Sequence, residues 1–223
     1  ISDQWACSRI QESFLLLMQM ELPMETILAA ARIATRSLAK SLIVLNPAPM
    51  PRNGLPEALV SLIDIIILNQ VEATQMLKLE PISGALNPEQ CLRAVQRYGQ
   101  QFQHDWTIVV TLGKDGVIIT AGQDCEIVHV PAVDLSKIGK QVVSTVGAGD
   151  CWTGAFCAFL GDALGQNDEN KQQFHSSSNY KTALLRAAAS FACVAAALSV
   201  SKSGAQESIP KRDEVEEASA CLA

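Results

Sequence analysis

The sequence predicts an α/β fold built on a mostly parallel sheet, because short apolar runs alternate along it with amphipathic stretches. Runs rich in branched residues have the length of buried strands and cover residues 14–20, 41–45, 64–68 and 107–112. Helical spacing of apolar residues marks the stretches between them, at residues 23–40, 71–78 and 87–103. Alternation of this kind builds a parallel sheet with helices on both faces.

Local signals support the helices. Pro23 stands at a first-turn position, and Asn87 is the expected N-cap of its helix, with Pro88 behind it. Three more helices are expected at residues 149–164, 180–200 and 212–220.

The remaining segments connect or extend these elements. Residues 117–120 and 126–130 are expected as antiparallel strands joined through 121–124. Residues 165–179 are polar, so we expect a solvated loop there and assign it no function.

Composition limits the size and class of the protein. With 223 residues and 48% hydrophobic content, the chain can bury one good core, so a single domain over residues 1–223 is expected. The net charge of −6 is spread without long runs, which argues against nucleic acid or an anionic membrane as partner. Seven cysteines without Cys-x-x-Cys spacing favour a reducing compartment, the cytoplasm or the nucleus. We find no apolar run of membrane-spanning length and no signal peptide.

The most informative segment contains Gly147, Ala148, Gly149 and Asp150, at the start of a run with helical apolar spacing. A helix N-terminus carries partial positive charge and unpaired N–H groups, so this turn suits a phosphate or another oxyanion. Asp150 beside such a site could accept a proton from an attacking hydroxyl group. The alternative is a glycine-rich turn in which Asp150 only complements the helix dipole.

Polar residues directly follow the apolar strands, and ligands of open α/β sheets bind at the carboxyl ends of the strands. The residues at these positions are Glu21, Asn46, Asn69 with Glu72, and Thr111 with Gly113. Each also has a structural interpretation: an exposed acid at Glu21, a turn residue at Asn46, and a helix cap for Asn69 with Glu72. Residues 111–116 could equally form a hairpin turn. His104, His129 and His175 show no ligand spacing and are interpreted as incidental.

Residues 143–156 resemble the C-terminal signature of the ribokinase-like carbohydrate kinases, the phosphofructokinase B type. Five other segments resemble this family in matching order and approximate spacing: residues 16–23, 45–49, 69–72, 111–116 and 204–210. The resemblance implies a three-layer αβα sandwich with a mostly parallel central sheet. The chain begins with Ile1 and resembles only the C-terminal two-thirds of the family, so we expect the lid and the N-terminal strands to be missing.

The resemblance also implies roles for individual residues. Asp150 is the base, assisted by the amides of Gly147, Ala148 and Gly149, while Glu21 binds the sugar and Glu72 holds Mg²⁺ through water. The nucleotide-binding residues that it implies are Asn69, Thr111, Gly113, Lys114, Asp115, Gly116, Gly149 and Cys193. For Cys193, a buried packing role is the alternative. A contact of Asn46 with phosphate or a magnesium-bound water is the alternative to its role as a turn residue.

A monovalent cation site, for K⁺, is implied at Ser144, Val146, Ser199, Lys202, Gly204 and Ser208. The family usually has Asp at the position of Ser144, so this chain lacks the strongest charge of that site. Potassium dependence is therefore expected to be weakened or absent.

The function implied is an ATP-dependent sugar kinase of the ribokinase type, which converts D-ribose and ATP to D-ribose 5-phosphate and ADP with Mg²⁺. A kinase of the adenosine kinase or fructokinase type stays an alternative, as does a non-catalytic nucleotide-binding remnant. Without the lid, water is not excluded and the sugar is poorly oriented. We therefore expect the isolated 223 residues to be nearly inactive. A homodimer is expected for the full-length parent, and an exposed apolar sheet edge for this chain.

Overall fold

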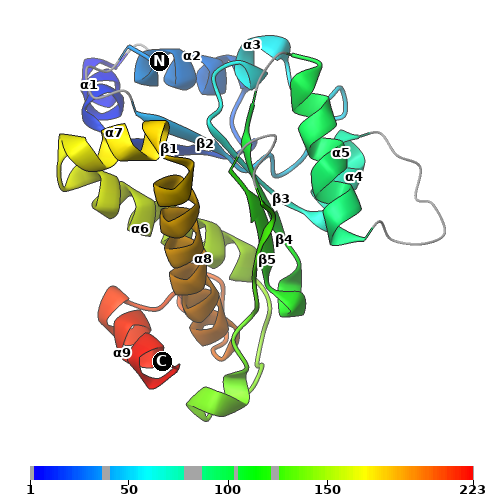
Figure 1. Cartoon of the computed structure of the whole chain (residues 1–223), viewed down its shortest axis with the longest axis vertical. Coiled ribbons are helices and arrows are strands. Elements are labelled where there is room, and N and C mark those ends of the chain that lie inside the picture. Colours follow the sequence, from blue (N-terminus) through cyan, green and yellow to red (C-terminus); the bar gives the residue numbers. More distant parts are fainter. Residues whose placement is uncertain (1–2, 37–40, 78–86, 103–104, 122–125, 223) are drawn as a thin grey trace. The chain divides into compact units, whose positions relative to one another are not determined.

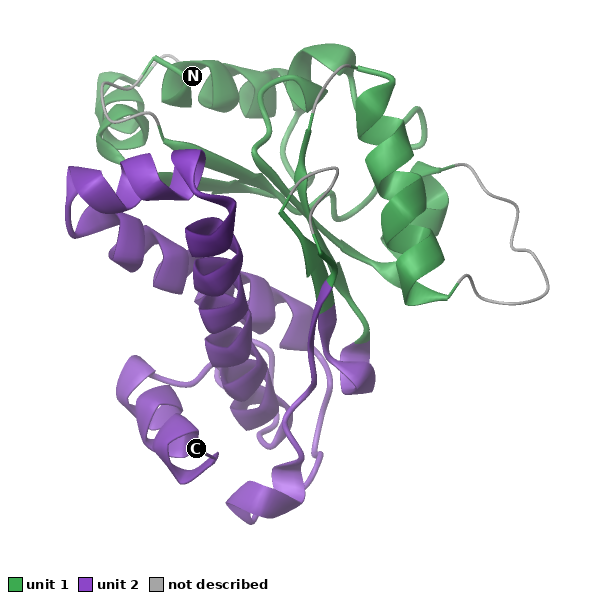
Figure 2. Cartoon of the chain, in the orientation of Figure 1, with its two compact units in different colours: residues 1–112, 118–127 green, residues 113–117, 128–223 purple. Residues whose placement is uncertain are grey.

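The computed structural model describes residues 3–36, 41–77, 87–102, 105–121 and 126–222 (Figure 1). The chain forms two compact units, coloured in Figure 2. Unit 1 contains residues 1–112 and 118–127, and unit 2 contains residues 113–117 and 128–223. The sequence predicts one domain over residues 1–223. The chain passes between the two units more than once, and one boundary lies between Val117 and Ile118, within a strand.

The strands are β1 (Leu15–Met18), β2 (Leu42–Leu45), β3 (Ile65–Asn69), β4 (Thr107–Thr111), β5 (Val117–Thr120) and β6 (Val128–Val130). The α-helices are α1 (Gln4–Glu12), α2 (Met24–Ala34), α3 (Glu57–Val60), α4 (Gln70–Met76), α5 (Pro88–Gln100), α6 (Ala148–Gly165), α7 (Asp168–Ser176), α8 (Ser178–Val200) and α9 (Arg212–Leu222). Short 3₁₀ helices cover η1 (Gly113–Asp115) and η2 (Leu135–Ile138). The α/β class predicted from the alternation is confirmed.

The sheet has the order β1-β2-β3-β4-β5-β6, and β1 to β4 are parallel. The chain therefore always crosses to the next strand in the same direction. Because such crossovers are right-handed, the connecting helices of unit 1 lie on one face of the sheet. Figure 1 shows α4 and α5 together on one side of β3 and β4.

The core of unit 1 follows from this topology. Alternate residues of the parallel strands point to the helical face, and Ile43, Leu45, Ile66 and Leu68 pack in one cluster with the helix residues. The intervening residues Leu42, Val44, Ile65 and Ile67 are also buried. Burial on both faces explains why these strands are continuous apolar runs.

Unit 2 is built around α6 and α8, which run side by side, with α9 packed against α8. Trp152 and Phe156 of α6 stack with ring centroids 4.9 Å apart, and Cys151 packs with Val194, Ala195 and Leu198 of α8. No apolar run of membrane-spanning length was expected, yet α8 is long and apolar enough by composition. We interpret α8 as a core helix, because 56% of its apolar window is buried within the protein.

Three α-helices of the described residues, α1, α3 and α7, were not predicted from the sequence. The expectation of a solvated loop at residues 165–179 is wrong, because α7 covers Asp168–Ser176. Its surface is polar, so it shows no helical apolar spacing. The helix is held by Asn167, which caps the Asn170 amide at 2.8 Å, by the ion pair of Lys171 with Asp168, and by the buried ring of Phe174. Asp3 caps the Trp5 amide at the start of α1, and α3 is only four residues long.

Several predicted elements end earlier or begin later than expected. The helix predicted at residues 23–40 ends at Ala34, with Pro23 as its N-cap, and residues 37–40 lie outside the described residues. The same holds for residues 78, 103 and 122–124 of the predicted segments.

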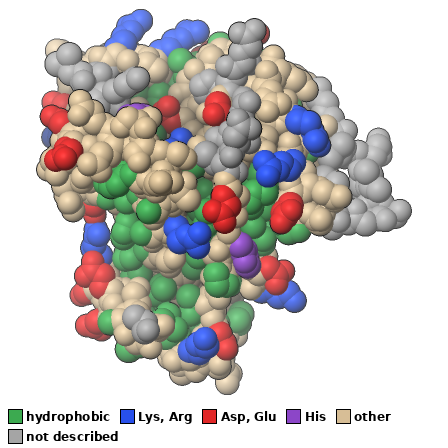
Figure 3. Space-filling model, viewed as in Figure 1, with side chains coloured by type: hydrophobic (Ala, Val, Ile, Leu, Met, Phe, Trp, Pro, Cys, Tyr) green, Lys and Arg blue, Asp and Glu red, His purple; other side chains and the backbone are tan. Residues whose placement is uncertain are grey.

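On the face seen in Figure 3, acidic and basic side chains are interspersed.

Candidate functional site

The carboxyl ends of the parallel strands carry the polar residues of unit 1. Met18 lies beside Leu45 in the register, and Asn69 lies beside Thr111. Asn46 follows β2 directly, and its backbone N–H donates to the Met18 carbonyl at 2.9 Å. The register thus brings the ends of neighbouring strands, predicted from the apolar runs, to the same edge.

Asn69 and Glu72 form a capping box at the start of α4. The Glu72 amide donates to Asn69 Oδ1 at 2.8 Å, and the Asn69 amide donates to Glu72 Oε2 at 2.9 Å. The structural interpretation of Asn-x-x-Glu is therefore confirmed. It does not exclude a binding role, because the box also fixes the direction of the carboxylate.

Asn46 differs from an exposed turn residue. The residue is only 8% exposed, and its Nδ2 donates to the Ile67 carbonyl at 3.0 Å and to Glu72 Oε2 at 3.5 Å. Its Oδ1 accepts from Gln19 Nε2 at 3.4 Å. The side chain thus points inward to the carboxylate, which disfavours direct contact with a phosphate.

Glu21 is exposed, three residues after the end of β1 and two before Pro23, the N-cap of α2. This position fits both interpretations of Glu21, the exposed acid and the sugar-binding carboxylate. The cluster that unit 1 assembles contains Gln19, Asn46, Asn69 and Glu72. No role was expected for Gln19, because the apolar pattern places it within the strand predicted at residues 14–20, whereas β1 ends at Met18.

In unit 2, Gly147 is the N-cap of α6 and adopts a left-handed conformation with φ 77°. A β-carbon at Gly147 would lie 3.2 Å from Ala205 Cα, so both the turn and the neighbouring chain require glycine. Gly149 has open space at the same place, with no heavy atom within 4 Å of a built β-carbon. Asp150 is exposed in the first turn of the helix.

The first-turn amides are not equivalent. The Ala148 amide donates to the Thr145 carbonyl at 3.3 Å, and the Cys151 amide donates to the Gly147 carbonyl at 2.9 Å. An α-helix leaves its first N–H groups without intrahelical acceptors, and Gly147 and Gly149 add no side chain in front of theirs. The turn predicted from the glycines is therefore present at a helix start, whereas the Ala148 amide is engaged in the turn itself.

Several of the residues expected to hold a monovalent cation form hydrogen bonds with one another. Ser144 Oγ accepts from the Val146 amide at 3.3 Å, and the Ser199 carbonyl accepts from the Lys202 amide at 3.0 Å. Ser208 Oγ is fully buried, lies 2.9 Å from Ser199 Oγ and donates to the Ala205 carbonyl at 3.0 Å. This set offers no carboxylate and uses its one buried hydroxyl pair internally, so it fits a tightly bound cation poorly.

Gly204 and Lys202 also have structural roles. Gly204 is left-handed, with φ 90°, and a β-carbon there would lie 2.6 Å from Glu207 Oε2. Lys202 forms an ion pair with Glu214 of α9 at 3.0 Å. Hydrogen bonds from the Lys211 amide and from Lys202 lower the pKa of Glu214.

The segment after β4 is a turn, as predicted, and η1 covers Gly113–Asp115. Gly116 has φ 90°, and a β-carbon would lie 2.1 Å from the Val130 carbonyl oxygen. His129 Nε2 lies 2.8 Å from the Asp115 carbonyl oxygen. Gly116 is thus fixed by close backbone packing, while Gly113, Lys114 and Asp115 are exposed.

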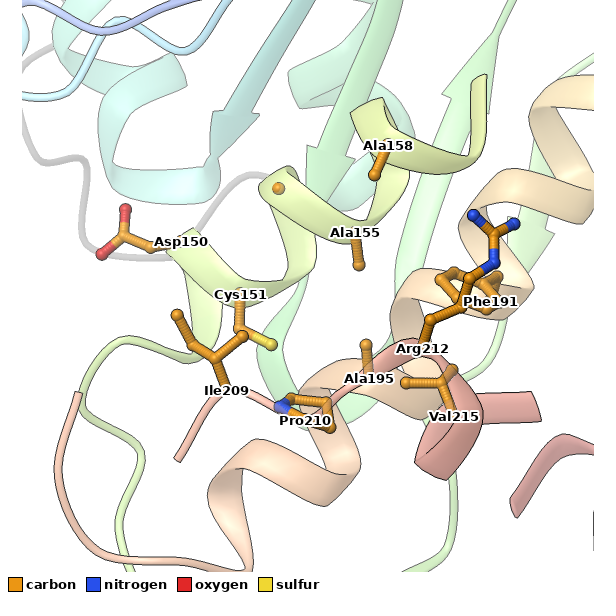
Figure 4. A pocket seen from close by; sticks show the side chains of 11 residues that line it. Asp150, Cys151, Ala155, Ala158, Phe191, Ala195, Ile209, Pro210, Arg212 and Val215 are labelled. Carbon is orange, nitrogen blue, oxygen red and sulfur yellow. The ribbon is translucent and has the colours of Figure 1, made fainter. Parts of the chain in front are cut away.

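A cavity of about 270 Å³ lies in unit 2 along α6 (Figure 4). Its walls are mainly apolar and include Ala155, Phe191, Ile209 and Val215, with Asp150 at the rim. Figure 4 shows the Asp150 carboxylate pointing away from these apolar side chains. The Asp150 carboxylate is therefore exposed to solvent at the rim of the cavity and does not point into it.

Two buried thiols lie close to this turn. Burial raises the pKa of Cys151, and the charge of Asp150 adds to the effect, so the thiol next to Asp150 stays neutral. Cys193 is 6% exposed and accepts a hydrogen bond from the Trp152 indole N–H at 3.4 Å. This contact favours the packing role of Cys193 over nucleotide binding.

Among the described residues, no group of three or more His, Cys, Asp or Glu side chains could hold a metal ion. Mg²⁺ bound with a nucleotide needs only one or two carboxylates, since it keeps several waters and takes phosphate oxygens. Glu72, a hard oxygen ligand at a strand end, fits that requirement.

Sequence comparison identifies a family for most of the chain. The pfkB family of carbohydrate kinases matches residues 7–212. The ribokinase of Lactococcus lactis subsp. lactis is 30% identical over 218 residues. That alignment covers 96% of this chain and 56% of the relative, so the chain spans little more than half the length of the relative.

Solved structures agree on the fold. The ribokinase of Giardia lamblia matches with a TM-score of 0.77 and 25% identity, over 95% of this chain and 62% of that one. The Arabidopsis thaliana ribokinase, solved with ribose and ATP, matches with a TM-score of 0.75 over 98% of this chain and 59% of that one. At 23% identity, this second likeness shows the fold alone.

Proposed function

Because this chain belongs to the pfkB family of carbohydrate kinases, we propose that it carries the phosphoryl-transfer machinery of an ATP-dependent sugar kinase. The reaction would convert D-ribose and ATP to D-ribose 5-phosphate and ADP. The observation that carries this proposal is the start of α6, where a left-handed Gly147 opens the helix and Asp150 is exposed in its first turn. The ribokinase relatives support ribose as the sugar.

Unit 2 supplies the proton acceptor and the anion site. Asp150 takes the proton of the primary sugar hydroxyl as that oxygen attacks the γ-phosphorus of ATP. The amides of Gly147 and Gly149 stabilise charge on the transferred phosphoryl group, aided by the positive end of the helix. Since the Ala148 amide donates to Thr145, it contributes through the shape of the turn.

Unit 1 supplies the groups for magnesium and the nucleotide phosphates. Glu72 would hold Mg²⁺ through water, and Asn69 would orient the phosphates. When bound, the ion would neutralise charge on the phosphates during transfer. Glu21 would receive sugar hydroxyls, and Thr111 would contact the nucleotide.

The exposed residues of η1 are the remaining nucleotide contacts that we propose. Gly113, Lys114 and Asp115 offer backbone and side-chain donors for the ribose and phosphates of ATP, while Gly116 fixes the loop. We exclude Cys193 from this set, because its thiol is buried against Trp152. We also propose that K⁺ is not required, because Ser144 brings no carboxylate and Ser208 is paired with Ser199.

A coupled assay of ADP release tests the function. A longer version of the protein, in which we expect turnover, is incubated with ATP, Mg²⁺ and ribose, fructose or adenosine, and its Asp150→Asn variant is compared with wild type. We expect ribose to be the best substrate and Asp150→Asn to lower kcat by about 10²–10⁴-fold, the range of general base catalysis. Equal rates for both proteins would contradict the role of Asp150.

The non-catalytic alternative has a distinct outcome in the same assay. The 223-residue chain and a longer version of the protein are compared, since the chain spans 56% of its relative. We expect turnover in the longer protein and little in the chain alone. A longer protein that binds ATP but turns over none of the three substrates would favour a nucleotide-binding remnant.

A further inference from the structure

We infer that Gln19 and Asn46 are positioning residues that hold the Glu72 carboxylate in one orientation. This inference rests on the proposed function for its consequence, namely the affinity for a divalent cation. It rests on unit 1 alone for its geometry. The residues involved come from three successive strand ends, after β1, β2 and β3.

The orientation of the Asn46 amide is fixed by chemistry. The Ile67 carbonyl oxygen can only accept, so the group that lies 3.0 Å from it must be the NH₂ of Asn46. The opposite atom, Oδ1, therefore faces Gln19, whose Nε2 donates to it at 3.4 Å. No flipped amide satisfies both neighbours.

The direction of these bonds leads to Glu72. Gln19 donates to Asn46, and Asn46 Nδ2 donates to Glu72 Oε2 at 3.5 Å. The same oxygen accepts the Asn69 amide at 2.9 Å. Two donors that converge on Oε2 fix the plane of the carboxylate and so the direction in which Oε1 points.

The burial of Asn46 makes this arrangement stiff. Asn46 is only 8% exposed, so little water can replace a lost partner, and its backbone N–H donates to the Met18 carbonyl. The Asn46 side chain is also short, so it has few rotamers. Glu72, on the first turn of α4, is thereby aligned against the sheet as well as against its own helix.

Groups that orient a metal-binding carboxylate commonly control metal affinity by about 10–100-fold. We therefore expect Gln19→Glu and Asn46→Leu each to weaken Mn²⁺ binding in the presence of ADP by about tenfold. Gln19→Glu keeps the size of the side chain but replaces the donor with a carboxylate. Electron paramagnetic resonance of free Mn²⁺ measures the affinity.

A second measurement needs neither metal nor nucleotide. The Asn69 amide bonds to Glu72 Oε2, so its hydrogen exchange reports the position of that carboxylate. Both variants should speed exchange at Asn69 by about tenfold, as expected for a weakened bond to a charged acceptor. The Asn87 amide, which bonds to Gln90 Oε1 in the other capping box, should be unchanged.

Gln96→Leu is the matched control. Gln96 is also a buried amide of unit 1, 8% exposed, and bonds to Arg93 and Thr120. We expect this variant to lower the melting temperature as much as Asn46→Leu and to change neither Mn²⁺ affinity nor exchange at Asn69. Adding Gln19→Glu to Asn46→Leu should have no further effect, because Gln19 acts through Asn46.

The outcomes separate this inference from the proposed function. Exchange at Asn69 that stays at the wild-type rate in both variants would overturn the inference. Additive effects of the two substitutions would also overturn it. A wild-type protein that fails to bind Mn²⁺ with ADP contradicts the magnesium role in the proposed function, while the exchange data still decide the role of Gln19 and Asn46.

Discussion

Asn69 and Glu72 bond reciprocally at the start of α4, with the Glu72 amide 2.8 Å from Asn69 Oδ1 and the Asn69 amide 2.9 Å from Glu72 Oε2. A pattern that is typical of a helix cap therefore also holds a carboxylate at the edge where ligands of α/β proteins bind. The second capping box, Asn87 with Gln90 at the start of α5, has the same hydrogen bonds without an acidic group. Matched substitutions in the two capping boxes can therefore distinguish a capping role from a binding role.

Asn69→Ala and Asn87→Ala should each lower the free energy of unfolding by about 0.5–2 kcal/mol, because each removes an N-cap side chain. Only Asn69→Ala should also weaken the binding of Mn²⁺ with ADP. Urea unfolding and Mn²⁺ titration on the same preparations measure the two effects. If both variants bind Mn²⁺ as wild type does, Asn69 is a cap and nothing more.

The two glycines of the α6 turn predict opposite effects. Gly147→Ala should destabilise the protein by about 1–2 kcal/mol, because an L-residue is strained in the left-handed region and its β-carbon would meet Ala205. Gly149→Ala should be neutral or stabilising by up to about 1 kcal/mol, because alanine favours the helix and has open space there.

Turnover should fall in Gly149→Ala even though this variant stays folded and stable. A methyl group at Gly149 would stand in front of an amide that we assign to the phosphoryl group, and loss of one such donor costs about 10²–10³ in rate. Urea unfolding and ADP release on Gly149→Ala check both parts. Full activity in a stable Gly149→Ala protein would remove that amide from the proposed anion site.

The fold was predictable where the apolar runs are uninterrupted. Residues such as Ile43 and Ile66 lie in uninterrupted apolar runs because both faces of their strands are buried, and this made β2 and β3 plain from the sequence. Helix α7 was not predictable in this way. It buries mainly Phe174 and depends on the Asn167 cap, and one aromatic residue in a polar stretch defines no period.

For the site, the sequence indicated which residues stand at strand ends but not where their side chains point. Asn46 follows β2 as expected, yet it turns inward to Ile67 and Glu72, because a carbonyl and a carboxylate there need a donor. Cys193 shows the same limit. Its position on α8 was clear, whereas its contact with Trp152 depends on the packing of α6 and α8.

The buried thiol of Cys157 predicts a loss of stability at alkaline pH. Burial raises the pKa of Cys157 from 9.0 to about 12. Above pH 9 the unfolded state releases this proton while the folded state keeps it, so the free energy of unfolding falls as the pH rises from 9 toward 12. Below pH 9 both states are protonated, and the group adds no pH dependence.

Cys157→Ala should therefore lose less stability between pH 8 and pH 10 than wild type, measured by urea unfolding and expressed relative to each protein at pH 8. Exposed Cys221 provides the control, and Cys221→Ala should keep the wild-type slope. A Cys157→Ala slope equal to that of wild type would show that the thiol ionises alike in both states.

The turn at Ser144 predicts that the protein does not respond to potassium, and that one substitution confers a response. Ser144 Oγ accepts the Val146 amide at 3.3 Å, a bond that an Asp side chain makes equally well, so Ser144→Asp should keep the turn. It adds the carboxylate charge that the loop lacks.

Melting temperatures in KCl and in choline chloride at equal ionic strength report cation binding without any need for activity. Wild type should melt at the same temperature in both salts. Ser144→Asp should melt higher in KCl, by about 2–4 °C for each kcal/mol of binding free energy in a protein of this size. A wild-type protein stabilised by KCl would show that the paired hydroxyls of Ser199 and Ser208 rearrange to hold the ion, whereas an unresponsive Ser144→Asp protein would show that the missing charge is not what limits the site.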